Sequence, residues 1–342
     1  MKHAILSAAL AASTALVSPA MAETNLSFNI FFPQTHFSWP VFQAWADDIA
    51  AATNGEVRIT FPAQSVAPPP GILDAVRNGV ADGGFIFNGF IANSNPGTMI
   101  TQMPWMSLND SKAMSTVLWN TYERVFAPVE DWRGVHLASM FHLGPTYLCS
   151  VTDTPITTLD DLKSRRVWAL PGTIADTLSD MGLAIVAGPA VQVQELTSRN
   201  TVDAHLGLTL ETIVSFGVAP YTKSCVEMSP ALQSANFSIF FNQRAWDKLT
   251  DAQRAAIDEL SGPALAARLG AATDAAEAAA RAELEAQGVT FAPIEPGLLS
   301  AMEASAAKIS GGWEGAISNA YGIDAAALVA ETRAAVTDAS GQ

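Results

Sequence analysis

Short stretches that alternate hydrophobic and polar residues are followed along the chain by stretches with apolar residues at helical spacing. Residues 26–32 alternate in their first half, which is typical of a half-buried strand. From Trp39 to Ala52 the spacing is helical, and Asn54-Gly55 supplies the left-handed turn that ends many helices. This alternation of strand and helix predicts an α/β protein with a largely parallel sheet. The first set comprises strands at 26–32, 57–61 and 81–87 and helices at 39–52 and 72–78.

A second set of the same kind begins near Val135. Thr158 is a residue type that commonly caps the start of a helix, and Pro171-Gly172 stops the strand before it. We expect strands at 135–141, 166–170, 201–206 and from 185, and helices at 159–163, 175–181 and 191–199.

Residues 264–287 are dominated by Ala, Glu, Arg and Leu and contain no Pro. They predict one helix of about 35 Å. Helices of this length and composition often bridge two lobes, although a plain surface helix has the same pattern. The sequence therefore predicts two α/β lobes and additional helices.

The N-terminus has the three parts of a secretory signal peptide. Lys2 is followed by an apolar run over residues 4–17, and Ala20 and Ala22 stand at the −3 and −1 positions before Glu23. We expect residues 1–22 to be removed after Ala22 and the mature protein to be soluble and exported to the periplasm. An ordinary N-terminal helix is the alternative. No later stretch reaches the roughly 18 apolar residues of a membrane span.

Composition narrows the function classes. The 342 residues are enough for about two domains, and 49% apolar content excludes a disordered or fibrous chain. The formal net charge of −15 argues against a nucleic-acid partner, because phosphate binding needs a surplus of cations.

The chain has two cysteines, Cys149 and Cys225, each in a short, apolar, strand-like run. In an oxidising periplasm this context favours a strand-to-strand disulfide over two free thiols. Closing so long a loop stabilises a fold by roughly 4 kcal/mol in the chain-entropy model.

The chemistry of an enzyme is hard to find in this sequence. His136 and His142 could share one strand face, but nothing identifies a third metal ligand. There is no HExxH, CxxC, Gly-rich phosphate loop or nucleophile elbow. We therefore predict no catalytic residue, no metal and no cofactor.

Several short blocks, taken in order, resemble a known family. The blocks are Thr53-Asn54-Gly55, residues 73–82, Met103-Pro104-Trp105, Pro155-Ile156, residues 161–164, Pro171-Gly172, Val202-Asp203 and residues 240–249. Their order and spacing over about residues 26–290 resemble the extracytoplasmic solute-binding proteins of tripartite ATP-independent periplasmic (TRAP) transporters, the DctP-like group.

The resemblance implies a two-lobed fold with hinge strands and a long helix spanning both lobes. Residues 23–146 and 235–275 would form lobe I, and residues 147–234 and 276–342 would form lobe II. A small solute would be bound in the cleft between the lobes, and the loaded protein, a monomer, would dock on a membrane permease driven by an ion gradient.

This sequence departs from the family at the residues that hold a carboxylate. The family's arginine on the strand after residues 161–164 falls on Trp168, and its asparagine after the second aspartate block falls on Gly207. Arg166 lies two residues upstream on the same strand face. The opposing interpretation is that the match to the family is shifted, so that Arg166 is the arginine that binds the carboxylate.

An indole in place of a guanidinium favours aromatic rings, or an ammonium through cation–π attraction. We therefore expect a small neutral, aromatic or amine-bearing solute, with Trp168 as one wall and Glu211 or Asp203 available to neutralise an amine. The alignment places six more residues near the cleft, although core packing explains the aromatic ones equally well. They are His36, Phe37, Trp39, Asn88, Trp105 and Tyr147.

A transport receptor accounts best for the signal peptide, the two lobes and the missing catalytic groups. The alternatives are a carboxylate receptor that uses Arg166, a sensor-input protein of the same fold, and, third, an exported enzyme.

Overall fold

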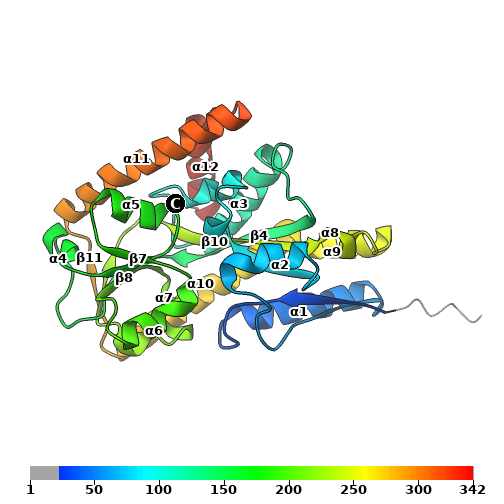
Figure 1. The fold of residues 1–342 in the computed structure, drawn as a ribbon, viewed down its shortest axis with the longest axis horizontal. Helices are drawn as coiled ribbons and strands as arrows, with labels where there is room; N and C mark the ends of the chain where they lie inside the picture. The colour runs from blue at the N-terminus through cyan, green and yellow to red at the C-terminus, as the bar shows by residue number, and fades with distance from the viewer. Residues whose placement is uncertain (1–22, 342) are drawn as a thin grey trace, which may run out of the picture.

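The computed structural model describes residues 23–341 and divides them between two mixed β-sheets flanked by helices (Figure 1). The expected signal peptide, residues 1–22, lies outside the described residues. The predicted two-lobed α/β fold is confirmed. None of the described helices combines the length and apolar character that a membrane span requires.

The sheet of lobe I has the order β2-β1-β3-β10-β4. Its first three strands are parallel, as the βαβα pattern predicts, but β10 runs antiparallel to both β3 and β4. The lobe is built from strands β1 (Thr24–Asn29), β2 (Val57–Thr60), β3 (Gly83–Phe87), β4 (Val135–Pro145) and β10 (Ser234–Asn242); helices α1 (Ser38–Ala52), α2 (Ile72–Arg77), α3 (Ser111–Val125), α8 (Gln243–Trp246) and α9 (Asp251–Leu260); and 3₁₀ turns η1 (Pro69–Gly71), η2 (Asn88–Phe90) and η3 (Pro96–Gln102).

The sheet of lobe II has the order β11-β9-β5-β8-β6-β7. Strands β6, β7 and β8 are parallel, and β5 is antiparallel to its two neighbours. This lobe contains β5 (Tyr147–Ser150), β6 (Val167–Ala169), β7 (Ile185–Ala187), β8 (Ala204–Leu208), β9 (Ser224–Glu227) and β11 (Thr290–Pro293); helices α4 (Leu159–Lys163), α5 (Thr173–Asp180), α6 (Val193–Ser198) and α7 (Leu210–Ser215); and 3₁₀ turns η4 (Ala190–Gln192) and η5 (Ala219–Tyr221).

Local sequence signals explain several element boundaries. Thr158 begins α4 with a capping box, in which its hydroxyl accepts from the Asp161 N–H and the Asp161 carboxylate accepts from the Thr158 N–H. The carboxylate also accepts from Thr157, and these hydrogen bonds hold the pKa of Asp161 well below its usual range. Residues 159–163 therefore form the helix that the sequence predicts.

Before the C-terminal helices, three segments connect the lobes. The chain passes from lobe I to lobe II between β4 and β5, and it returns between β9 and β10. The third connection is α10 (Gly262–Ala286), the predicted long helix. Its first half packs on α1, α3 and β4 of lobe I, and its second half reaches α7 of lobe II.

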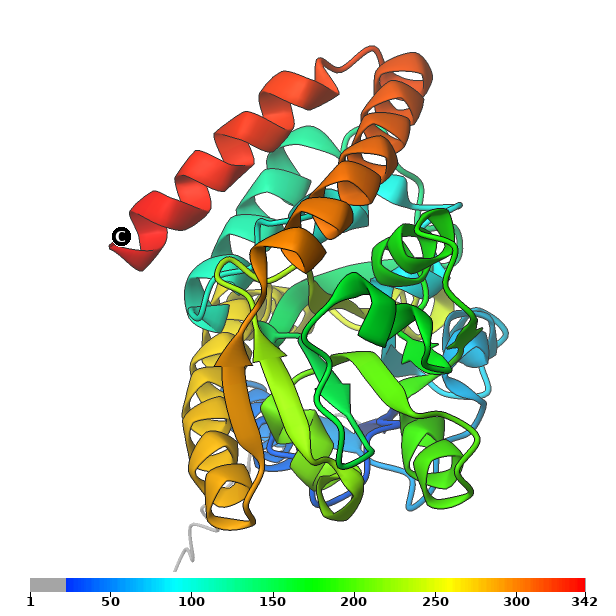
Figure 2. The same ribbon diagram turned by 90° about the vertical axis from the view of Figure 1, so that its left-hand side faces the viewer.

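The last two helices follow one another on one side of the molecule and diverge from the turn that joins them (Figure 2). Helix α11 (Pro296–Tyr321) is attached to lobe II by Lys308, whose Nζ lies 2.8 Å from the Asp180 carboxylate. It is attached to lobe I by Trp313, whose Nε1 donates to the Pro96 carbonyl at 3.0 Å. Helix α12 (Ala325–Ser340) packs against α3 of lobe I. The assignment of residues 276–342 to lobe II stays a prediction, and in this packing α12 lies on the lobe I side.

Candidate functional site

A cavity lies between the lobes, at the carboxyl ends of parallel strands from both sheets. Phe31 and Phe32 follow β1, Phe87 ends β3, Leu170 follows β6 and Leu208 ends β8. In open α/β sheets this edge is where ligands bind. The lining residues are Phe31, Phe32, Pro69, Phe87, Phe90, Leu143, Ala235 and Phe237 from lobe I, and Leu170, Pro189, Ala190, Gly207, Leu208, Thr209, Thr212 and Phe216 from lobe II.

Six phenylalanines dominate this lining, and their rings contact one another. Phe87 meets Phe90 edge-on at 5.3 Å, and Phe237 meets Phe32 edge-on at 5.4 Å. Phe216 of lobe II meets Phe32 of lobe I at 5.8 Å, so the aromatic wall crosses the boundary between the lobes. Edge-to-face contacts of this kind suit the positive edge of one ring to the negative face of another. The free space left among these side chains is about 30 Å³, so a further ring enters only when the side chains or the lobes move apart.

The polar groups of the cavity are few and uncharged. Among the lining residues that the structure describes, the polar side chains are Thr209 and Thr212, and none is charged. Thr209 caps α7: its hydroxyl accepts from the Thr212 N–H at 3.1 Å and donates to the Thr212 hydroxyl at 2.9 Å. The Thr212 hydroxyl therefore keeps its own hydrogen for another acceptor. A charged ligand group here would lose its water without gaining an ion pair.

Gly207 is the one residue of the predicted site that lines the cavity. Its φ of +125° is in the region that favours glycine. A Cβ at this position would also collide with the Cβ of Leu170. An asparagine does not fit this backbone, which gives the departure from the family pattern at Gly207 a steric reason.

Trp168 and Arg166 precede the cavity along β6. Trp168 is fully buried in lobe II, two residues before Leu170, and its indole N–H has no hydrogen-bond partner among the described residues. Arg166 is half exposed and donates to both oxygens of Asp203, at 3.0 and 2.8 Å, and to the Asn200 carbonyl. Neither side chain lines the cavity in this arrangement. Their roles toward a solute stay predictions.

His36, Phe37 and Glu211 lie behind the cavity wall. The His36 ring stacks on Phe32 at 4.1 Å and on Phe37 at 4.5 Å. Its Nε2 lies 3.1 Å from the Glu211 carboxylate, which belongs to the other lobe. These predicted residues are therefore close to the cavity without lining it.

The other four predicted residues support the fold around the cavity. Trp39 donates from its indole nitrogen to the Phe32 carbonyl at 3.0 Å, and so holds the segment that carries Phe32. Asn88 is buried and accepts from the Ser238 hydroxyl at 2.6 Å. The backbone N–H of Trp105 donates to the Leu232 carbonyl. Tyr147 lies beside α10, 6.2 Å from Phe291.

The histidines considered as metal ligands lie apart from one another. His136 stacks on Trp246 at 3.8 Å, with its Nε2 3.2 Å from Asp258. His142 is fully buried beside Thr101, and burial lowers its pKa to about 3. In the described part of the chain, no three His, Cys, Asp or Glu side chains gather as a metal site would need.

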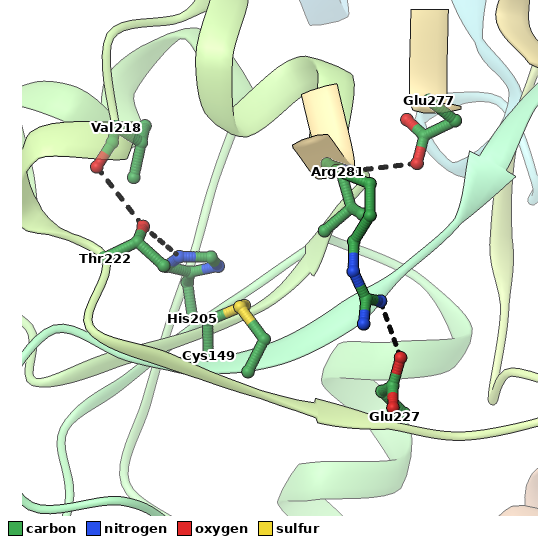
Figure 3. The surroundings of a disulfide bond; sticks show 9 residues. Cys149, His205, Val218, Thr222, Glu227, Glu277 and Arg281 are labelled. Carbon is green, nitrogen blue, oxygen red and sulfur yellow. Dashed lines mark hydrogen bonds and ion pairs between the residues drawn. A yellow bond between two sulfur atoms is a disulfide. The ribbon is translucent and has the colours of Figure 1, made fainter. Parts of the chain in front are cut away.

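The predicted disulfide between Cys149 and Cys225 is confirmed (Figure 3). The two residues lie directly opposite each other on β5 and β9. His205, the neighbour of Cys149 on β8, is fully buried, and its Nε2 lies 3.5 Å from the Thr222 hydroxyl. Burial lowers the pKa of His205 to about 3.

None of the six cavity phenylalanines was among the predicted site residues: Phe87 and Phe90 lie one and two positions from the predicted Asn88, whereas Phe31, Phe32, Phe216 and Phe237 lie four or more positions from any predicted residue. Phe87 and Phe90 flank the predicted Asn88, and Phe31 and Phe32 end the predicted first strand. The usable signal was the cluster of aromatic residues at the carboxyl end of each predicted strand.

Known proteins resemble this chain in sequence and in fold. The sequence pattern of the bacterial extracellular solute-binding proteins, family 7 (DctP), matches residues 28–311. An outer membrane transporter protein of Comamonas testosteroni, TsaT, is 28% identical over 312 residues, 91% of each chain. A TRAP periplasmic solute-binding protein from Bordetella bronchiseptica, with bound (R)- and (S)-mandelate, is 26% identical with a TM-score of 0.86, over 92% of this chain and 99% of that one. A marine metagenome TRAP protein specific for aromatic acids, in complex with 3-hydroxybenzoate, is 25% identical with a TM-score of 0.82, over 93% of this chain and 99% of that one.

Proposed function

This chain belongs to the bacterial extracellular solute-binding proteins, family 7, and from that premise we propose that it captures a small aromatic solute between its lobes for a TRAP permease. The membership confirms the resemblance that the ordered sequence blocks indicated. Proteins of this family are receptors for small solutes that work with membrane permease subunits.

The observation that carries the proposal is the aromatic cavity. Both lobes contribute phenylalanines to it, so closing the lobes surrounds a ring on several sides. Burying a ring among such side chains is favourable without any charged partner. The mandelate and 3-hydroxybenzoate in two related structures also carry a benzene ring, which supports this class of solute.

For the polar end of the solute, we propose an uncharged group that accepts a hydrogen bond from Thr212. The described residues that line the cavity include no cation, and Arg166 is bonded to Asp203. An amine has no free carboxylate nearby either, because Glu211 already faces His36.

An aromatic carboxylate is the second candidate, favoured by the acids bound in the two related structures. Uncharged donors would have to hold it here, or Arg166 would have to leave Asp203.

Calorimetric titration with benzamide, benzyl alcohol, benzylamine, benzoate and mandelate tests both candidates. We expect benzamide or benzyl alcohol to bind more tightly than benzoate. Phe90→Ala and Phe216→Ala, one from each lobe, should each weaken binding by about tenfold or more. Phe291→Ala, on β11 outside the cavity, is the matched control. If no aromatic compound binds, the aromatic proposal is wrong. Tight benzoate binding that Arg166→Ala abolishes would establish the carboxylate alternative.

We also propose that the protein acts in the periplasm as a monomer after cleavage behind Ala22. N-terminal sequencing of the exported protein tests the cleavage, and sedimentation tests the monomer. Uptake of the bound compound by cells should require both this protein and a permease. A sensor-input protein would leave uptake unchanged when it is deleted. Recovery of the compound unaltered after incubation would speak against an exported enzyme.

A further inference from the structure

One contact between a histidine and a carboxylate crosses the boundary between the lobes beside the cavity. His36 follows β1 in lobe I, and Glu211 lies in the first turn of α7 in lobe II. Their Nε2 and Oε2 atoms are 3.1 Å apart, with side-chain exposures of 0% and 8%. We call His36 and Glu211 the interlobe pair.

Each of these two atoms has the other as its polar neighbour. Within residues 23–341, neither His36 Nε2 nor Glu211 Oε2 makes a hydrogen bond to any group, so each has only the 3.1 Å contact with the other. The second nitrogen of the ring, Nδ1, faces Ser38 and accepts from its backbone N–H at 3.2 Å. A neutral ring that accepts at Nδ1 carries its hydrogen on Nε2, the nitrogen that lies beside the carboxylate.

The interlobe pair is coupled to the cavity through its aromatic wall. The His36 ring stacks on Phe32 at 4.1 Å and lies 6.0 Å from the ring of Phe216. Phe32 and Phe216 line the cavity from opposite lobes. A second contact between the lobes lies next to it, where the Thr35 hydroxyl donates to the Ser215 carbonyl at 3.1 Å.

Burial makes this contact sensitive to the arrangement of the lobes. When the lobes separate, water solvates both side chains. When the lobes close, a carboxylate without His36 would be buried with no partner for Oε2, which is strongly unfavourable. The pair therefore favours the closed arrangement only while both partners are present.

We propose that His36 and Glu211 are positioning residues that hold the lobes closed and so slow the release of a captured solute. The part that concerns solute release rests on the proposed function. The part that concerns closure does not.

Single-molecule energy transfer on the solute-free protein tests closure. Dyes on Lys163→Cys in lobe II and Lys248→Cys in lobe I report the distance between the lobes, since both positions are exposed and the native cysteines are paired. His36→Ala and Glu211→Ala should each lower the ratio of closed to open molecules by about tenfold or more. The ratio of closed to open molecules in the double variant should be no lower than in the more impaired single variant, because the two groups act together. Glu211→Gln keeps an acceptor oxygen and should fall between Glu211→Ala and the native protein.

The matched control is another histidine–carboxylate contact, His136 with Asp258, at 3.2 Å within lobe I. His136→Ala and Asp258→Ala should leave the ratio of closed to open molecules unchanged. Ratios that are the same in the native protein and the interlobe variants would overturn the proposal. Thermal unfolding of each variant separates a loss of closure from a loss of folding.

Stopped-flow kinetics with the compound that binds best in the calorimetric panel tests solute release. The interlobe variants should release it about tenfold faster or more, with little change in the association rate, because the pair forms after the solute has entered. If no panel compound binds the native protein, the proposed function fails, while the energy-transfer result still decides on closure. If the native protein binds and the variants match it in both measurements, the interlobe proposal alone fails.

Discussion

Asp274 and Glu277, three residues apart on α10, cap the first turns of two helices that belong to different lobes. The Asp274 carboxylate accepts from the N–H groups of Ser111 and Lys112 at the start of α3. The Glu277 carboxylate accepts from the N–H groups of Leu210 and Glu211 at the start of α7. One helix thus fixes an element of each lobe through carboxyl oxygens that accept from otherwise unpaired backbone donors.

Glu277 should make stability fall as pH rises through the neutral range. Burial raises its pKa to about 7, against 4.5 for an ordinary glutamate, so between these values the folded protein holds a proton that the unfolded chain has released. The stabilisation that Glu277 contributes is therefore complete below about pH 4.5 and is lost as the pH rises through 7. Urea unfolding at pH 5 and pH 8 should show that Glu277→Gln removes about 2 kcal/mol of this decline, less than the full value because the side chain is only partly buried.

Glu283→Gln, which changes an exposed carboxylate on the same helix, is the control for net charge. An unchanged decline in Glu277→Gln would mean that another group is responsible.

His205 should act in the opposite direction, at acid pH. The unfolded chain binds a proton on this side chain near pH 6.5, whereas the folded protein does so only near pH 3. Stability is therefore lost as pH falls below about 6.5, by about 2 kcal/mol at pH 5. We expect His205→Phe to lose correspondingly less stability between pH 8 and pH 5 in chemical denaturation. Thr222→Val removes the hydroxyl beside His205 without removing the titrating group, and it should keep the native pH profile.

Gly207 should not tolerate the asparagine of the family pattern. Gly207→Asn is expected to cost roughly 2 kcal/mol or more, because it combines an unfavourable backbone conformation with a collision against Leu170. The melting temperature of the variant measures this cost. Gly182→Asn, at a φ of +77° with no neighbouring atom within 4 Å, should cost much less, because asparagine tolerates the left-handed region and nothing there collides with it. Equal losses in the two variants would remove the contact with Leu170 from the explanation.

The disulfide should contribute stability through the length of the loop that it closes. Cys149 and Cys225 are 76 residues apart, for which the chain-entropy model gives roughly 4 kcal/mol. Guanidinium unfolding of the Cys149→Ala/Cys225→Ala variant should show a loss of this size. Adding a reductant should destabilise the native protein by a similar amount and leave the variant unaffected. A reductant effect on the variant would point to a cause other than the disulfide.

Local signals in the sequence predicted several elements well. Residues 159–163 form a helix because Thr158 and Asp161 cap each other within one turn, and that information is contained in four consecutive residues. The long helix also followed from composition, and α10 covers residues 262–286 against the predicted 264–287.

Non-local pairing accounts for what the sequence did not show. Strand β10 is buried along its whole length, so it lacks the alternation that marks a half-buried strand, and its antiparallel pairing with β3 and β4 joins residues distant in the chain. It carries Phe237 to the cavity. The sequence also did not show which residue of β6 reaches the cavity: Leu170 lines it, while Trp168, two residues earlier, is buried inside lobe II.

The position of the disulfide also limits how the lobes can move. Cys149 lies just after the outgoing strand crossing, and Cys225 lies shortly before the returning one. The covalent bond between them makes both strands enter lobe II as a single anchored ribbon. We therefore expect lobe II to move on this ribbon as one unit, with torsion about either strand alone suppressed.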